Sequence, residues 1–130
     1  MALKSTNPTA TESWKKLQAH FETIKSIHLK ELFESNPKRA EELTIKWEDF
    51  YVDFSKNRIT KETLNSLIEL ANEVDLKDAI SKYFEGDIIN ATEGRAVLHT
   101  ALRAKEDAKV YVEDVNVIPE IYEVKQKIKD

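Results

Sequence analysis

The sequence predicts a mainly α-helical chain with one short β-hairpin. Its 130 residues include only two glycines, and 34% of them are charged, a composition typical of soluble, helix-rich proteins. Apolar residues recur at steps of three and four along most of the chain, whereas the pattern alternates between residues 44 and 54. A chain of this length can bury roughly two-thirds of the surface that its unfolded form exposes. We therefore expect residues 1–130 to form a single folded unit.

The first helix is predicted from Thr11, because four apolar residues then share one stripe that should face a core. These residues are Trp14, Leu17, Phe21 and Ile24. The run from His28 to Phe33 continues in helical register. Pro37 suits the first position of a short turn or helix that extends through Leu43.

A β-hairpin is predicted over residues 44–54, with Glu48 and Asp49 as its polar link. The alternating apolar residues are Ile45 and Trp47 in the first strand and Phe50, Val52 and Phe54 in the second. Two strands alone are marginally stable in water. The hairpin should therefore pack on a helix or join a larger sheet.

Three more helices are predicted in the middle of the chain. Thr60 can cap the first, and Gly86 can end the second. The third would be capped by Asn90 or Thr92, with Glu93 in its positively polarised first turn. Their apolar residues are Leu64, Leu67, Ile68 and Ala71, then Leu76, Ile80 and Phe84, then Ala96, Val97, Leu98, Ala101 and Leu102. The third helix would be apolar around much of its circumference, so it should be buried on more than one side.

A short strand at residues 110–112 and a turn at Asp114 precede a last predicted helix, from Pro119 to Lys129. No capping residue follows this helix. We therefore expect that the sequence stops at a boundary within a longer polypeptide.

Composition argues against several classes of partner. The formal net charge is −4, and basic residues do not gather around aromatic ones, so nucleic acid is not expected as a partner. No apolar run is long enough to cross a bilayer, and the first ten residues are polar, so we expect no membrane contact and a cytoplasmic location. With no cysteine, disulfides and thiolate chemistry are excluded.

Two blocks carry closely spaced, distinctive residues: Asp53-Phe-Ser-Lys-Asn57 and Ile89-Asn-Ala-Thr-Glu-Gly-Arg-Ala-Val-Leu-His-Thr-Ala-Leu-Arg103. In this order and at about this separation they resemble two blocks near the amino terminus of the phosphoglucose isomerase family. The longer block is the specific one, because so many fixed identities rarely coincide by chance. Asp114 and Asn116 stand where the family usually has Gly and then Asp, and both residue types can still form a turn.

The resemblance implies an aldose-ketose isomerase that interconverts glucose 6-phosphate and fructose 6-phosphate in glycolysis and gluconeogenesis. Such enzymes are homodimers without a metal or organic cofactor. This chain would be an N-terminal subdomain of their α/β three-layer sugar-isomerase (SIS) fold. The family's Gly-Gly-Ser and Ser-Lys-Thr phosphate segments, its base Glu, its ring-opening His and its late Lys all follow the region matched here. We therefore assign no catalytic, substrate-binding, cofactor or metal residue to this chain.

Several residues have side chains of the types used in catalysis, but each has a structural interpretation. Glu93 beside Arg95 has the residue types of a base with a charged partner, but a helix start explains the glutamate. His99, inside the apolar helix, should be a buried, hydrogen-bonded group. His20 and His28 have no partners at metal-ligand spacing.

The remaining polar and aromatic candidates have similar structural interpretations. Arg95 and Arg103 would share one side of the helix and form ion pairs at a domain interface. Lys56 and Asn57 should form a turn with a solvated lysine. Trp14 and Trp47 should be packing residues. The charged stretch of residues 38–42, with Lys38, Arg39, Glu41 and Glu42, should be a solvated helix face.

Two functions from different classes remain. In the first, the chain is the amino-terminal segment of an isomerase, partnered by the rest of the polypeptide and a second subunit, and has no isomerase activity alone. In the second, it is a stand-alone helical interaction module derived from that segment. In either case the isolated chain should expose apolar surface and tend to self-associate.

Overall fold

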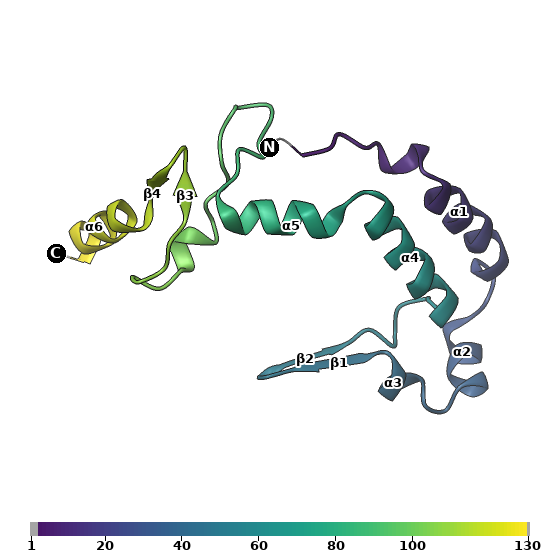
Figure 1. Ribbon diagram of the computed structural model, residues 1–130. Coiled ribbons are helices and arrows are strands. Elements are labelled where there is room, and N and C mark those ends of the chain that lie inside the picture. Colours follow the sequence, from purple (N-terminus) through teal and green to yellow (C-terminus); the bar gives the residue numbers. More distant parts are fainter. Residues whose placement is uncertain (1–2, 130) are drawn as a thin grey trace. The chain divides into compact units, whose positions relative to one another are not determined.

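The computed structural model describes residues 3–129, which are mainly helical with short antiparallel hairpins (Figure 1). They form two compact units, residues 7–73 and residues 74–129 together with 3–6, and each is described by itself. In chain order the helices and strands are η1 Pro8–Ala10, α1 Glu12–Ile24, α2 Leu29–Ser35, α3 Arg39–Glu42, β1 Thr44–Trp47, β2 Phe50–Asp53, α4 Lys61–Glu73, α5 Leu76–Glu85, η2 Ala101–Arg103, β3 Tyr111–Val112, β4 Val115–Asn116 and α6 Ile118–Lys129. No helix among these residues is long and apolar enough to span a bilayer.

Helix starts in the first unit follow their capping residues. The Thr11 hydroxyl accepts the Trp14 N–H at 3.2 Å and begins α1. The Thr60 hydroxyl accepts the Thr63 N–H at 3.3 Å and begins α4. These two helices pack against each other in opposite directions, because residues 12 and 13 contact residue 73 while residue 20 contacts residue 63.

The prediction that the apolar stripe of α1 faces a core is wrong for the described residues. The buried side chains of α1 are Ser13 and His20, whereas Phe21 is 57% exposed. The other stripe residues, Trp14, Leu17 and Ile24, are only half-buried. The reason is that α4 meets α1 through hydroxyl, carboxylate and imidazole groups, which draw the polar side of α1 inward.

The predicted hairpin is confirmed as β1 and β2, paired antiparallel with Ile45 opposite Val52 and Trp47 opposite Phe50. Glu48 takes the left-handed conformation (φ 48°) in the tight link between them. Beyond the strands the Phe54 N–H still donates to the Leu43 carbonyl at 3.0 Å.

The second unit has its core where η2, β3 and α6 meet. Ala101, Val110 and Ile118 are buried there. The surrounding apolar side chains are Leu98, Ala104, Ala108, Val117, Ile121 and Tyr122. The predicted strand pairs with β4 into a second hairpin, so residues 3–129 have two hairpins where one was predicted. Its turn residues Glu113 and Asp114 both have positive φ, as the predicted Asp114 turn requires.

Two helix ends in this unit confirm their sequence signals. Gly86 ends α5 in the left-handed conformation, with φ 84°. The last helix, α6, starts at Ile118, one residue before Pro119, and the Asn116 side chain accepts the Ile118 N–H at 3.3 Å.

The helix predicted after Asn90 is wrong. Asn90 and Arg95 instead form an isolated antiparallel bridge, and over the residues of the predicted helix, 90–103, the structure has only the 3-10 helix η2. Gly94 is left-handed in the turn between them (φ 64°), which reverses the chain where a helix would have to continue. The expected burial holds in part, since Ala101 is fully buried while Leu102 is 48% exposed.

Candidate functional site

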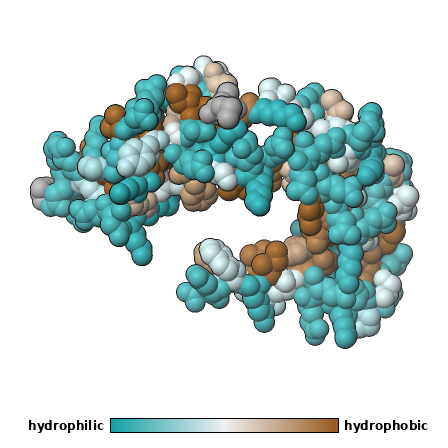
Figure 2. Space-filling model, viewed as in Figure 1, coloured by the Kyte–Doolittle hydropathy of each residue, from teal (hydrophilic) through white to brown (hydrophobic). Residues whose placement is uncertain are grey.

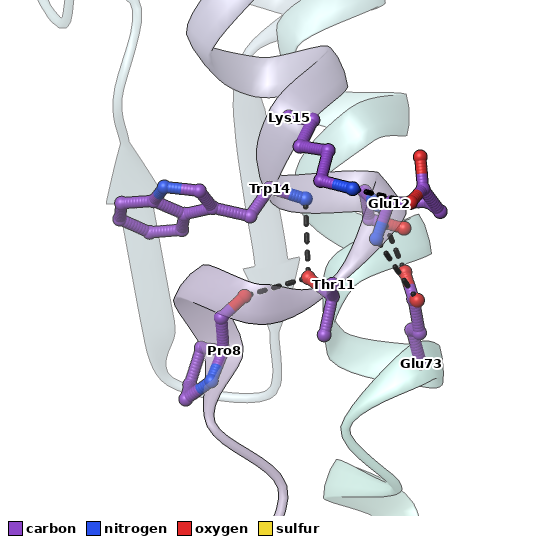
Figure 3. Close-up of polar contacts among 7 residues, drawn as sticks. Pro8, Thr11, Glu12, Trp14, Lys15 and Glu73 are labelled. Carbon is purple, nitrogen blue, oxygen red and sulfur yellow. Dashed lines mark hydrogen bonds and ion pairs between the residues drawn. The ribbon is translucent and has the colours of Figure 1, made fainter.

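The junction of α1 and α4 is organised by the carboxylate of Glu73 (Figure 3). One oxygen accepts the Glu12 N–H at 3.1 Å and the other accepts the Ser13 N–H at 2.9 Å. These N–H groups open α1 and have no partner within the helix, and the helix dipole favours a negative charge there. Hydrogen bonding from Ser13, through its side chain and then its backbone, lowers the pKa of Glu73, with smaller contributions from the Glu12 N–H and the Lys16 charge. The last turn of α4 therefore caps the first turn of α1.

The start of α1 has a second, local cap. The Thr11 hydroxyl donates to the Pro8 carbonyl at 2.6 Å and accepts the Trp14 N–H. Lys15 donates to the Glu12 carboxylate at 2.6 Å. Figure 3 shows the Trp14 ring turned away from Glu73, so the polar cap and the aromatic side chain lie on different sides of α1.

His20 is buried at the other end of this junction, with 8% exposure. Its Nε2 lies 2.6 Å from the Thr63 hydroxyl, and its Nδ1 lies 3.6 Å from a Glu62 carboxylate oxygen. Between His20 and the Glu73 cap, Lys16 pairs with Glu69 at 3.0 Å. These partners come from α4, more than 40 residues away in sequence, so spacing within α1 gives no sign of them.

His28 has a different structural use from His20. Its Nδ1 accepts the Lys30 N–H at 3.1 Å and caps α2. Residues 3–129 contain no group of three or more His, Cys, Asp or Glu side chains that could hold a metal ion.

Arg39 is a further polar residue whose role sequence reasoning missed. The prediction of a solvated face over residues 38–42 is wrong at this position. Its side chain is 3% exposed. Its Nε donates to the Ser55 carbonyl at 2.8 Å, its Nη2 donates to the Asn57 carbonyl at 2.7 Å, and the guanidinium carbon lies 5.6 Å from the centre of the Phe33 ring. One signal could have found it: Arg39 precedes the buried Leu43 by four residues, so both share a helix face.

Arg39 therefore holds the turn that carries the first family-like block. Asp53 strengthens the turn, since its carboxylate accepts the Ser55 N–H at 2.8 Å. The pKa of Asp53 is lowered by hydrogen bonds from the Ser55 side chain and backbone, and further by the Lys56 charge. Lys56 and Asn57 are exposed turn residues, as predicted.

Glu93 and Arg95 lie in the turn closed by Asn90. The Asn90 side chain accepts the Glu93 N–H at 3.2 Å and donates to the Glu93 carboxylate at 3.1 Å. The same carboxylate forms an ion pair with Arg95. The helix-start explanation of Glu93 is wrong because there is no helix, but its contacts are those of a turn residue whose carboxylate is already paired.

The expectation for His99 is also wrong, and the helix on which Arg95 and Arg103 would share one side does not form. His99 is exposed, because it lies in an irregular segment and not inside a buried helix. Arg103 donates to the His99 carbonyl at 3.0 Å. Arg95, His99, Leu98 and Leu102 line a shallow hollow in this unit, so the structure brings Arg95 and His99 together without a helix.

The two tryptophans differ in their surroundings. Trp14 is half-buried. Trp47 is 64% exposed and stacks on Phe50, with ring centres 5.5 Å apart. Trp47 is therefore not the packing residue that was predicted within residues 3–129, although its ring does stack on that of Phe50.

Comparison with known proteins gives one family. Residues 53–130, more than half of the chain, match the family model described as phosphoglucose isomerase. This chain belongs to the phosphoglucose isomerase family. The matched region begins at the Asp53 block and includes the longer block that ends at Arg103.

Curated glucose-6-phosphate isomerases resemble nearly the whole chain. The protein of that name from Christiangramia forsetii is 56% identical over 128 residues, which are 98% of this chain and 24% of the relative. The one from Nitrosospira multiformis is 47% identical over 122 residues, 94% of this chain and 22% of the relative. The chain thus spans about a quarter of the length of these phosphoglucose isomerases, and it matches their N-terminal region.

Proposed function

We propose that this chain acts as the N-terminal segment of a glucose-6-phosphate isomerase. The reaction is the interconversion of glucose 6-phosphate and fructose 6-phosphate, and the groups that bind phosphate and move the proton come from the part of the enzyme that this chain does not cover. The observation that carries the proposal is the match of 98% of this chain to only 24% of an isomerase. The cytoplasmic location and the second subunit belong to the same proposal.

The contacts of the polar residues support a scaffolding role for the segment. An isomerase needs a general base placed near the substrate carbons and donors aimed at developing negative charge. Here the carboxylate of Glu93 is paired with Arg95, and that of Glu73 is used to cap a helix. Buried His20 bonds to Thr63, and Arg39 bonds to backbone carbonyls. The contacts of Glu73, His20 and Arg39 each hold one element on another, and the pair of Glu93 with Arg95 lies within one turn.

The test is an assay of the purified 130-residue chain with fructose 6-phosphate, coupled to oxidation of the glucose 6-phosphate that would form. We expect no turnover above the rate without protein, because proton transfer between two carbons requires a positioned base and acid. Turnover that grows with chain concentration and survives repurification would defeat the proposal.

The second candidate function, a stand-alone interaction module, is favoured by the exposed apolar side chains of the hairpin and of α5. Phe50 is 62% exposed and Phe84 is 59% exposed. Large exposed apolar side chains of this kind mark docking surfaces. The coding sequence after Asp130 separates the two functions: a Gly-Gly-Ser phosphate segment soon afterwards supports the isomerase, and an immediate stop codon supports the module.

A further inference from the structure

We propose that the apolar face of the β1–β2 hairpin is a docking surface for the remaining part of the same isomerase subunit, and not for a second copy of this chain. The inference rests on the proposed function, because it takes that longer polypeptide as the partner.

The strand register creates this face. Residues directly opposite each other in an antiparallel pair project to the same side, and alternate residues of a strand do so too. The pairs Ile45–Val52 and Trp47–Phe50 therefore form one side, which we call the hairpin apolar face. The opposite side carries the pairs Thr44–Asp53 and Lys46–Tyr51, with the Lys46 ammonium 5.3 Å from the centre of the Tyr51 ring.

The hairpin apolar face is covered at its base and open beyond it. Leu43, which precedes β1, is only 3% exposed. The exposed fractions on the face itself are 57% for Ile45, 64% for Trp47, 62% for Phe50 and 50% for Val52. Figure 2 shows hydrophobic side chains gathered along the hairpin. Four large apolar side chains on one side and polar ones on the other are the pattern of a sheet with one covered face.

The size of the face argues against a second copy as its occupant. Two half-exposed aromatic side chains and two half-exposed branched ones present roughly 400 Å². Two such faces packed together would bury about 800 Å² in total, less than the roughly 1,200–2,000 Å² of a stable specific interface. A segment of the same polypeptide needs no such area, because its tether supplies an effective concentration in the millimolar range.

The lengths of the relatives supply the tethered partner. This chain covers 24% of the Christiangramia forsetii isomerase, so about three quarters of such a subunit lie outside the matched region. The occupant is expected to present aliphatic or aromatic side chains of a helix or sheet from that part, since the hairpin apolar face carries no charge. Lys46 and Asp53, on the other side, stay in water.

The test uses the absence of cysteine from this chain. A chimera joins residues 1–130 to the Christiangramia forsetii isomerase without its matching segment. Val52→Cys places a thiol on the hairpin apolar face, and Lys46→Cys places a matched thiol on the opposite side. Thiol labelling at the hairpin peptide is followed by mass spectrometry in the chimera and in the 130-residue chain, each at several protein concentrations, with circular dichroism as the check on folding.

The expected result is that Val52→Cys labels at least about tenfold more slowly in the chimera than in the 130-residue chain, at every concentration, as a site covered by packing should. Lys46→Cys is expected to label at similar rates in both. Equal rates for Val52→Cys would overturn the proposal. Protection that appears only as concentration rises would assign the face to a second copy, and protection already present in the dilute 130-residue chain would assign it to residues 74–129.

Isomerase activity of the chimera without the added cysteine tests the proposed function separately. A loss of that activity would not depend on how fast residue 52 is labelled.

Discussion

Replacement of Arg39 by methionine should destabilise residues 7–73 more than any exposed charge in that unit. The substitution keeps an unbranched side chain of similar length but removes both donors. It leaves the Ser55 carbonyl without its partner in a residue that is only 2% exposed. The Asn57 carbonyl also loses its donor, but it lies in an exposed residue that water can reach.

The magnitude follows from these three contacts. A buried carbonyl that loses its donor costs about 1–3 kcal/mol, and the more exposed carbonyl costs about 0.5–1 kcal/mol. The lost contact with the Phe33 ring adds about 0.5–1 kcal/mol. Part of this loss of stability is offset, because the variant no longer has the desolvation cost of a buried guanidinium charge. We therefore expect a loss of about 2–4 kcal/mol in the free energy of unfolding, out of the roughly 5–15 kcal/mol of a typical domain.

Urea titration followed by tryptophan fluorescence measures this loss, because Trp14 and Trp47 both lie in residues 7–73. Arg39→Lys should lose about half as much, since one ammonium cannot reach both carbonyls in the geometry of a guanidinium. Lys38→Met is the matched control at an exposed neighbour and should change stability by less than about 0.5 kcal/mol. If Arg39→Met behaves like Lys38→Met, the buried contacts of Arg39 do not hold the turn.

Two further predictions concern the helix cap and the glycines. Because the pKa of Glu73 is lowered in the folded chain, its contribution to stability is complete above the ordinary glutamate value and is lost as pH falls through the folded value. Ser13→Ala removes the side-chain hydrogen bond but keeps the backbone N–H, so it should move that pKa up. The carboxyl carbon shift of Glu73 in an NMR titration measures this, and an unchanged midpoint would refute the contribution of the Ser13 side chain. Gly86→Ala should lower the free energy of unfolding by more than about 2 kcal/mol, because a Cβ would lie 2.6 Å from the Tyr111 carbonyl oxygen at φ 84°. Gly94→Ala, at φ 64° with open space around it, should lose only about 1 kcal/mol. If thermal unfolding gives the same loss of stability for both substitutions, the close approach of Gly86 to the Tyr111 carbonyl has no effect.

Local signals predicted the elements that depend on neighbouring residues. Thr11 and Thr60 start helices through their own hydroxyls, and Gly86 ends one through its φ. The alternation around Trp47 predicted a hairpin because its side chains must project to two sides of the strands. In each case the deciding interaction spans only a few residues.

The predictions were wrong where one local sequence signal is compatible with two structures, or where a residue's contact partner lies far away in the sequence. The Asn90 side chain accepts the Glu93 N–H three residues on, which is the contact of a helix cap and of a tight turn alike. Gly94 decides for the turn. The inward face of α1 depends on α4, and the burial of Arg39 depends on carbonyls 16 and 18 residues away. The spacing of apolar residues within one helix predicts neither the inward face of α1 nor the burial of Arg39.

The resemblance predicted the family but none of the contacts of the candidate site. The longer block identified the family, which the match over residues 53–130 confirms. The pairing of Glu93 with Arg95, the exposure of His99 and the clamp by Arg39 could be learned only from the structure.

The most direct test of the central claim is the isomerase activity of the chimera that carries this chain in place of the first quarter of the Christiangramia forsetii enzyme. If the chain is an isomerase N-terminal segment without catalytic groups, kcat with fructose 6-phosphate should stay within about tenfold of the parent enzyme, a barrier change of about 1.4 kcal/mol or less. A folded chimera with no detectable turnover would contradict the claim.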